Sequence, residues 1–262
     1  MHTLTRAIDL TCDTRTGGVI PGQPPVLDLA AHPVRLWVTL EGAPHVDTGL
    51  LVDVARIDRA LAGALADLDR PLPGADALLD FAAAVFLRSF PEYALRRLAL
   101  DLTPRLQLAH SRWEETPMIE ITRSYDFAAG HRLGNPHWSD EQNRQAFGKC
   151  ANPHGHGHNY TVQVTIRARP DQIGHALQLD RLDDAVREFI LDRFDHKNLN
   201  ADTAEFASLN PTVENMAVVF FDLLDGRFAP AVLHRVRVWE SPKTFADYYG
   251  PQAGPLRYSH AI

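Results

Sequence analysis

The chain has 262 residues, 45% of them hydrophobic and 23% charged, which is ordinary for a soluble globular protein of one or two domains. Its formal net charge of −7 argues against a nucleic-acid-binding surface, and no apolar run is long enough for a membrane span. The two cysteines, Cys12 and Cys150, cannot form a dense disulfide framework, so we expect a cytoplasmic protein, although one bridge between them stays open.

Five segments of the first half have the apolar periodicity of strands or helices. In chain order we expect strands at 3–10 and 34–41, helices at 54–68 and 75–86, and a strand at 94–102.

The second half gives the same order after a junction near 111–117. Its apolar patterns predict strands at 119–127 and 160–166, helices at 182–190 and 213–224, and strands at 235–239 and 245–249. The second helix follows Asn210-Pro211, a suitable cap with proline at the first helical position. The order strand, strand, helix, helix, strand, strand predicts an α+β domain with its helices on one sheet face.

The two halves also share residues at matching positions. The matches keep the same order in both halves, and their spacing changes where loops can change length. We interpret the chain as a tandem duplication, with one unit at 1–110 and another at 118–262. The alternative is chance similarity between two amphipathic domains. The clearest matches pair Thr5, Arg6, Asp9 and Arg15 with Thr122, Arg123, Asp126 and Arg132.

The most informative segment runs from Cys150 to Tyr160 and reads CANPHGHGHNY. Side chains two apart on an extended backbone point the same way, so His156 and His158 present two imidazoles on one face. His131 ends the first strand of the same unit and meets them if the two strands form a hairpin. Catalytic Zn²⁺ sites typically have three protein ligands and one open position.

Other interpretations of this segment stay open. It could be a solvent-exposed His-Gly repeat, because an isolated His-x-His pair is a weak signal. Copper, iron and nickel also bind three imidazoles, but zinc is preferred because no oxygen-activating carboxylate stands out nearby. His154 could be a fourth imidazole, a substrate contact or neither.

Cys150 is not needed as a fourth ligand. Beside a divalent cation and Lys149 its pKa should be depressed, so that a thiolate exists near neutral pH and can act as a base or nucleophile. The alternative is a buried cysteine that serves as a small hydrophobic residue.

Three acidic positions complete the candidates. Asp195 can fix the tautomer of His196 and stabilise its protonated form, although such a pair at a helix end is more often a cap or a surface pair. Glu214 lies in the first turn of a helix, where the helix dipole alone would explain it. Glu240 ends an apolar strand and could accept two N–H bonds from a flat heterocycle.

Together these motifs resemble the 6-pyruvoyltetrahydropterin synthase / 6-carboxytetrahydropterin synthase family over residues 118 to about 250. Each motif alone is weak, and the combination is highly specific. The motifs are FAAGHRL from Phe127, FGKCANPHGHGHNY from Phe147, DHKNLN from Asp195, PTVEN from Pro211, and Glu240.

The resemblance implies the tunnelling fold, in which each unit is a four-stranded antiparallel sheet with two helices between its middle strands (ββααββ). Such units assemble side by side into barrels, with sites between neighbouring units. The expected protein is therefore a homo-oligomer built from tandem tunnelling-fold units, without nucleic-acid or membrane partners.

The resemblance also implies the residue roles and the substrate, 7,8-dihydroneopterin triphosphate. It makes Zn²⁺ the cofactor and Cys150, Asp195 and His196 the proton-transfer group. It makes Glu240 the pterin anchor, with Glu214 close to the substrate. The zinc ligands would be His131, His156 and His158.

Two features bear on the product and point in opposite directions. The run Thr212-Val213-Glu214-Asn215 is closer to carboxy-type members, whereas the six-residue step from Cys150 to His156 resembles the pyruvoyl type. Because the Ala/Arg/Leu-rich composition looks bacterial, we expect the 6-carboxy product, with acetaldehyde lost and a role in queuosine biosynthesis. Elimination of triphosphate to the 6-pyruvoyl product is the alternative.

When the two halves are aligned by their matching residues, the first unit lacks the site. Of the three zinc-binding histidines only one has a histidine at its matched position, His32, and one imidazole cannot hold zinc. We therefore expect residues 1–110 to be a degenerate, non-catalytic unit that completes the barrel, rather than an unrelated domain. The positions matched to His131, Cys150, His156, His158, His196 and Glu240 are Thr14, Pro24, Ala30, His32, Arg70 and Leu102.

Two further function classes compete with this interpretation. One is a zinc-binding assembly module without turnover, but a structural zinc would not need Cys150, Asp195, His196 and Glu240. The other is a pterin-binding hydrolase related by fold alone, which the context of Cys150 disfavours.

Overall fold

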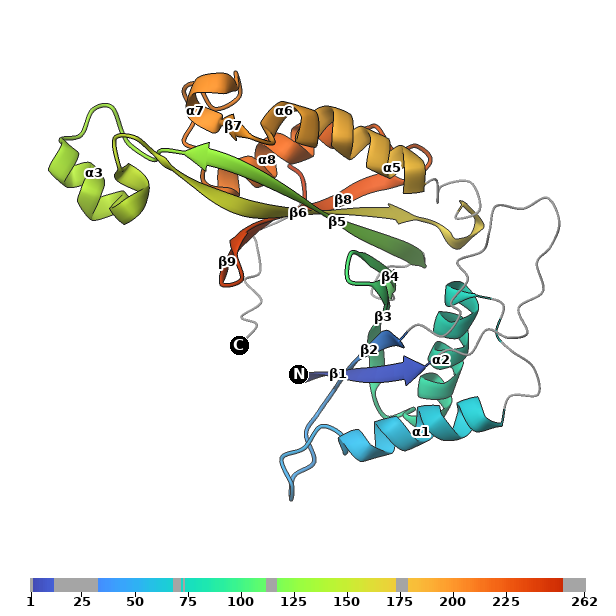
Figure 1. Cartoon of the computed structure of the whole chain (residues 1–262). Coiled ribbons are helices and arrows are strands. Elements are labelled where there is room, and N and C mark those ends of the chain that lie inside the picture. Colours follow the sequence, from blue (N-terminus) through green and yellow to red (C-terminus); the bar gives the residue numbers. More distant parts are fainter. Residues whose placement is uncertain are drawn as a thin grey trace. The chain divides into compact units, whose positions relative to one another are not determined.

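The computed structural model divides the chain into two compact units, Met1–Ile121 and Thr122–Ile262 (Figure 1). It describes residues 2–11, 33–67, 72, 74–111, 117–172 and 179–251. Among these residues, no helix is long and apolar enough to cross a membrane.

The first unit is an antiparallel sheet with two helices. Strands β1 to β4 pair in chain order, and α1 and α2 lie between β2 and β3 in the sequence and pack together (Figure 1). The elements are β1 (His2–Thr11), β2 (Pro33–Gly42), α1 (Val54–Ala66), α2 (Ala75–Ser89), β3 (Ala94–Thr103) and β4 (Leu106–Ser111).

Alternating apolar residues give the first unit its core. In β2 every second side chain from Val34 to Leu40 is buried, while α1 contributes Ile57 and Leu61. The Asp53 side chain accepts a hydrogen bond from the amide of Ala55 and so caps α1, which explains why this helix begins where it does.

The second unit has the same plan with insertions. Its main sheet has the order β5-β6-β8-β9, and a two-residue strand, β7, pairs in parallel with β5. The strands are β5 (Met118–His131), β6 (His156–Ala168), β7 (Lys197–Asn198), β8 (Val232–Ser241) and β9 (Thr244–Tyr248).

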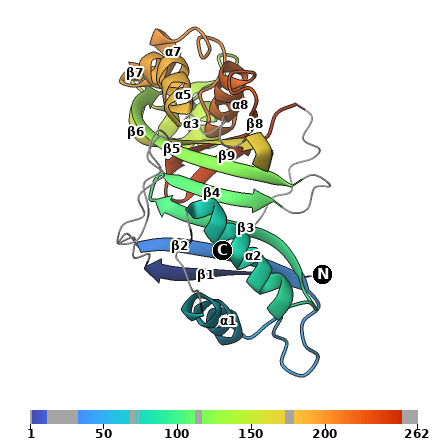
Figure 2. The same ribbon diagram turned by 90° about the vertical axis from the view of Figure 1, so that its right-hand side faces the viewer.

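The helices of the second unit lie in the connections between its strands. Helix α3 (Asp140–Phe147) lies in the β5–β6 connection, and a π-helical turn (Arg187–Leu191) joins α5 to α6. In Figures 1 and 2, α5 and α8 lie on the same side of the sheet. The remaining helices are α5 (Leu179–Val186), α6 (Asp192–Phe194), α7 (Leu199–Asp202) and α8 (Val213–Leu224).

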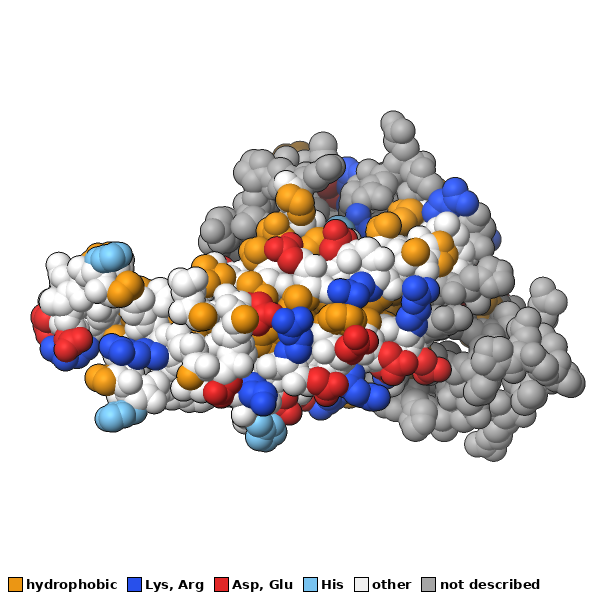
Figure 3. Space-filling model, turned by 90° about the horizontal axis from the view of Figure 1, so that it is seen from above, with side chains coloured by type: hydrophobic (Ala, Val, Ile, Leu, Met, Phe, Trp, Pro, Cys, Tyr) orange, Lys and Arg blue, Asp and Glu red, His pale blue; other side chains and the backbone are white. Residues whose placement is uncertain are grey.

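Aromatic and aliphatic side chains from one sheet face and from the helices fill the second core. Tyr160 on β6 stacks on Phe127 of β5 with ring centroids 5.1 Å apart, and Phe220 of α8 meets the same ring edge-on. The outer, helical surface of this unit mixes acidic and basic side chains without a continuous basic stripe on the face that Figure 3 shows.

The expected fold class is confirmed, because each unit is α+β with the order ββααββ. The segments predicted above do not include β4, β7, α3 and α7. Helix α3 carries a capping box between Ser139 and Gln142, but its only buried residue is Asn143. Without an apolar stripe it has no helical periodicity to detect.

One pair of matched threonines makes the same bond in both units. Thr5 bonds Thr39 through their hydroxyls at 2.9 Å, and the matching pair, Thr122 and Thr165, does so at 2.8 Å. The strand register also shifts at the same place in both sheets, directly after Thr39 in β2 and directly after Thr165 in β6.

A second shared contact ties the first strand of each unit to its first helix. Arg6 pairs with Asp58 of α1 at 2.7 Å, and the matching Arg123 pairs with Asp183 of α5 at 2.7 Å. The two units therefore share specific side-chain contacts as well as their order of elements.

Candidate active site

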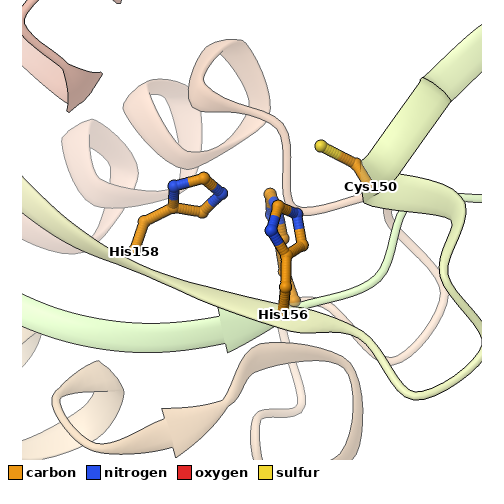
Figure 4. Close-up of side chains that lie close together, drawn as sticks. Cys150, His156 and His158 are labelled. Carbon is orange, nitrogen blue, oxygen red and sulfur yellow. The ribbon is translucent and has the colours of Figure 1, made fainter.

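The three predicted histidines and Cys150 meet at one end of the second sheet. His131 is the last residue of β5, His156 and His158 open β6, and Cys150 lies in the connection before β6. One ligand atom from each residue lies within 4.8 Å of the others. Figure 4 shows the rings of His156 and His158 and the sulfur of Cys150 facing one space.

Glycine allows the two strands to approach this closely. Gly155 has a φ of +68°, and a Cβ atom placed on it would lie 2.7 Å from the carbonyl oxygen of His131. An L-residue there would be strained by its backbone conformation and would also clash. The run from Gly155 to His158 thus supplies both the imidazoles and the space between the strands.

Burial favours the neutral form of His131 and His158. His131 is 1% exposed, and burial is the main cause that lowers its pKa; burial also lowers the pKa of His158. A group whose pKa lies below 6.5 carries little positive charge at pH 7. Neutral imidazole is the form that binds metal ions.

The nitrogen atoms fit a bound cation. Nε2 of His131 lies 3.1 Å from Nε2 of His156, and Nε2 of His158 is buried without a hydrogen-bond partner among the described residues. Zinc–nitrogen bonds of about 2.0–2.1 Å would separate two tetrahedral ligands by about 3.3 Å. A metal ion would satisfy all three nitrogens, so the donor set fits zinc.

Glu240, from the end of β8, reaches the same space. Its Oε1 lies 3.4 Å from Nε2 of His158 and 3.7 Å from Nε2 of His131, and its side chain is 21% exposed. The carboxylate therefore stands beside the histidines, on the strand expected for the pterin anchor.

The protein groups alone do not lower the pKa of the Cys150 thiol, so the expected low pKa depends on the divalent cation. Burial is the main cause that raises its pKa, and the negative charge of Glu240 raises it further. Lys149, from which a stabilising charge was expected, is exposed. Without a cation, Cys150 is thus a thiol at neutral pH.

Asp195 and His196 form the expected pair, with Nδ1 of His196 2.9 Å from Oδ2 of Asp195. Both residues are fixed to β5: the amide of Ala128 donates to Asp195, and the amide of His196 donates to the carbonyl of Ala128. The Ala128 amide is also the main cause that lowers the pKa of Asp195, which stays ionised.

His196 combines a strained backbone with an exposed ring. Its φ of 58° is the one positive value at a non-glycine residue in the described part of the chain, and its side chain is 82% exposed. Strain of this kind is retained where the surrounding structure imposes it, often at functional sites. The strain here accompanies the hydrogen bonds to Ala128.

An open pocket of about 400 Å³ is lined by both His158 and His196. Small residues form much of its wall. The lining residues are Ala128, Ala129, Gly130, Gly157, His158, Asn159, His196 and Lys197.

Glu214 and His154 stand apart from this arrangement. Glu214 is exposed in the first turn of α8, as the dipole explanation requires, and His154 is exposed in the turn before β6. No contact between either side chain and the histidine cluster is found among the described residues.

Sequence patterns missed two groups at the site. Tyr160 is fully buried with its hydroxyl 3.3 Å from Nδ1 of His131, and its place two residues after His158 was the available signal. The carbonyl oxygen of Pro211 lies 3.0 Å from the same nitrogen. A backbone carbonyl leaves no mark in a sequence.

Most first-unit positions matched to the site lie outside the described residues, as does Cys12. Leu102 is the exception and is buried in β3, so an apolar residue occupies the position matched to Glu240. The positions outside the described ranges are Thr14, Pro24, Ala30, His32 and Arg70.

Comparison with known proteins matches the second half of the chain. The 6-pyruvoyl tetrahydrobiopterin synthase of Drosophila melanogaster is 42% identical over 139 residues, or 52% of this chain and 83% of the relative. The 6-carboxy-5,6,7,8-tetrahydropterin synthase of Rickettsia felis is 25% identical over 151 residues, or 50% of this chain and 99% of the relative.

A solved structure of 6-pyruvoyl tetrahydropterin synthase from Caenorhabditis elegans is 36% identical with a TM-score of 0.47, covering 52% of this chain and 97% of that one. The family model described as 6-pyruvoyl tetrahydropterin synthase matches residues 120–251, half of the chain, and this range contains every residue of the site. The chain therefore belongs to the 6-pyruvoyl tetrahydropterin synthase family.

Proposed function

We propose that residues 118–262 form the catalytic unit of a zinc-dependent lyase that acts on 7,8-dihydroneopterin triphosphate. The observation that carries this proposal is the meeting of three imidazoles with Cys150 at one sheet end, beside Glu240. A structural zinc would not need the thiol or the Asp195–His196 pair, so this set favours an enzyme over an inactive zinc-binding module.

His131, His156 and His158 would hold the zinc ion, and the fourth position would face the substrate. When bound, zinc would act as a Lewis acid on the hydroxyl groups of the substrate side chain and acidify the positions beside them. The lowered pKa values of His131 and His158 support this role, because they keep the ligand nitrogens free of protons.

Cys150 is the proposed base, and His196 with Asp195 the second proton-transfer group. The raised pKa of Cys150 means that its thiolate must depend on a positive charge in the site, since the protein groups alone disfavour it. The ionised carboxylate of Asp195 accepts Nδ1–H of His196 and so fixes the tautomer of its ring, which suits a group that takes up and returns a proton.

Glu240 and Glu214 are the proposed substrate contacts. The Glu240 carboxylate can accept two N–H bonds from the amino group and ring N–H of the pterin, and its place beside the histidines supports this role. Glu214 is exposed at the start of α8, where it can meet substrate only from outside the histidine cluster.

The comparisons favour the 6-pyruvoyl product, formed with loss of triphosphate, because the 42% identical relative is named for it. The 6-carboxy product, formed with loss of acetaldehyde and leading towards queuosine, is the second candidate. The Thr212-Val213-Glu214-Asn215 run and the relative at 25% identity support it.

We also propose that residues 1–110 are a non-catalytic copy of the same unit. The shared threonine pairs and Arg–Asp contacts support a duplication, since unrelated domains would not place the same bonds at matching positions. Its proposed work is to complete a barrel in a cytoplasmic homo-oligomer. The exposure of His196 within one chain supports a site that a neighbouring copy completes.

Incubation of the purified, zinc-loaded protein with 7,8-dihydroneopterin triphosphate tests the function. Mass spectrometry identifies the pterin product, and a separate assay detects acetaldehyde. Release of triphosphate with a 6-pyruvoyl product supports the leading proposal, and acetaldehyde with a 6-carboxy product supports the second. No conversion by protein with confirmed zinc would refute both.

A further inference from the structure

Two groups face Nδ1 of the buried His131. The carbonyl oxygen of Pro211 lies at 3.0 Å and the hydroxyl of Tyr160 at 3.3 Å. A carbonyl only accepts hydrogen bonds, so its contact with a neutral imidazole requires the proton on Nδ1. The other nitrogen, Nε2, is then free of a proton and faces His156.

Two asparagines hold the segment that carries this carbonyl. Asn210 accepts a hydrogen bond from the amide of Gly134 at 3.0 Å through its side-chain oxygen, which ties it to the residues that follow β5. Its own carbonyl accepts a hydrogen bond from the side-chain nitrogen of Asn215 at 2.8 Å. Both bonds hold Asn210, the residue directly before Pro211, and its carbonyl also accepts from the amide of Thr212 directly after Pro211.

We propose that Asn210 and Asn215 are positioning residues for the metal site. By holding the Pro211 carbonyl on Nδ1 of His131, they fix the ring tautomer and aim Nε2 at the cation. This inference rests on the zinc site proposed above and adds the groups that orient one of its ligands. Loss of such orienting contacts typically weakens metal binding about 10- to 100-fold.

The opposite hydrogen-bonding roles of the two asparagines give a matched test. Asn210→Asp keeps the acceptor for Gly134, whereas Asn215→Asp replaces the donor to the Asn210 carbonyl with an acceptor. Both variants add one negative charge near the site. We expect Asn210→Asp to bind zinc at least as tightly as the wild type, and Asn215→Asp and Asn210→Ala to bind about 10- to 100-fold more weakly.

The measurement is the zinc dissociation constant of the full chain, obtained by competition with a chromophoric chelator. The visible spectrum of the cobalt-substituted protein adds a direct record of ligand geometry. Asn143→Asp is the control, because Asn143 is a buried asparagine, 5% exposed, that bonds backbone groups of Asn135 and Trp138 instead. It should lower the stability of the metal-free protein without changing zinc affinity.

Tyr160→Phe separates the two neighbours of Nδ1, because it removes the hydroxyl and leaves the Pro211 carbonyl in place. We expect zinc affinity within about threefold of the wild type and an unchanged cobalt spectrum. A large loss in Tyr160→Phe with none in Asn215→Asp would overturn the proposal, and so would equal affinities in Asn210→Asp and Asn215→Asp. If the wild type takes up no zinc, the proposed function fails first; if it binds zinc without turnover, this inference still stands or falls on the variants.

Discussion

Cys150 and the histidines share one small space, and burial affects their protonation in different ways. It favours neutral imidazole, which is the metal-binding form, but it also favours the neutral thiol, which is the less reactive form. A metal-binding imidazole and a reactive thiolate can therefore exist together here only if a cation is present, because the cation binds the imidazoles and stabilises the thiolate.

Cys150→Ala tests the role of the thiol as a base. Removal of a base typically costs about 10²- to 10⁴-fold in rate, so kcat should fall by that factor. Zinc content should stay at the wild-type level, because three histidines suffice as ligands. Turnover and bound zinc are measured on the same samples. Undiminished turnover would remove Cys150 from the mechanism.

At the scale of elements, the site depends on how closely the end of β5 approaches the start of β6. Gly155 permits this approach through its positive φ and its missing side chain. Gly226, after α8, has a similar φ of +74°, but a Cβ atom there would meet nothing within 4 Å. A side chain at Gly226 would thus cause backbone strain alone, whereas one at Gly155 would cause the same strain and a clash with β5.

We predict that Gly155→Ala weakens zinc binding, because the carbonyl of His131 must move away from the new methyl group. Gly226→Ala should only lower the free energy of unfolding by about 1–2 kcal/mol, the usual cost of a left-handed L-residue. Zinc titration and denaturant unfolding of both variants check this. Equal zinc affinity in the two would show that the clash is absorbed elsewhere.

The sequence predicted the elements and ligands that depend on local periodicity. His156 and His158 stand two apart in a strand, and the apolar stripe of α8 is regular, so both could be inferred. The pKa of Cys150 could not, because it depends on burial in the folded chain and on Glu240 from a distant strand. Neither could the Pro211 carbonyl, which is a backbone group placed by the asparagines around it.

In the whole molecule the two units share a plan, and the histidine cluster found among the described residues lies in the second unit. The contacts of Arg6 with Asp58 and of Arg123 with Asp183 serve the fold in both, whereas the histidine cluster belongs to the second unit. Ligands that bind only the folded state stabilise the part of the structure that they contact.

Zinc should therefore protect the second unit and leave the first unchanged. At a free concentration of 100 times the dissociation constant, zinc adds about 2.7 kcal/mol to the stability of the state that binds it. Hydrogen exchange with and without a chelator should show slower exchange at the end of β5 and the start of β6. Equal protection in β1–β3 would contradict the assignment of metal binding to the second unit alone.

The most direct test of the central claim is X-ray absorption at the zinc edge of the metal-loaded protein, together with the zinc content per chain. We expect one zinc ion per chain, bound by three imidazole nitrogens and no sulfur. A shell at about 2.3 Å would identify the Cys150 sulfur as a ligand and contradict its role as a base. A protein that binds no zinc would contradict the whole account.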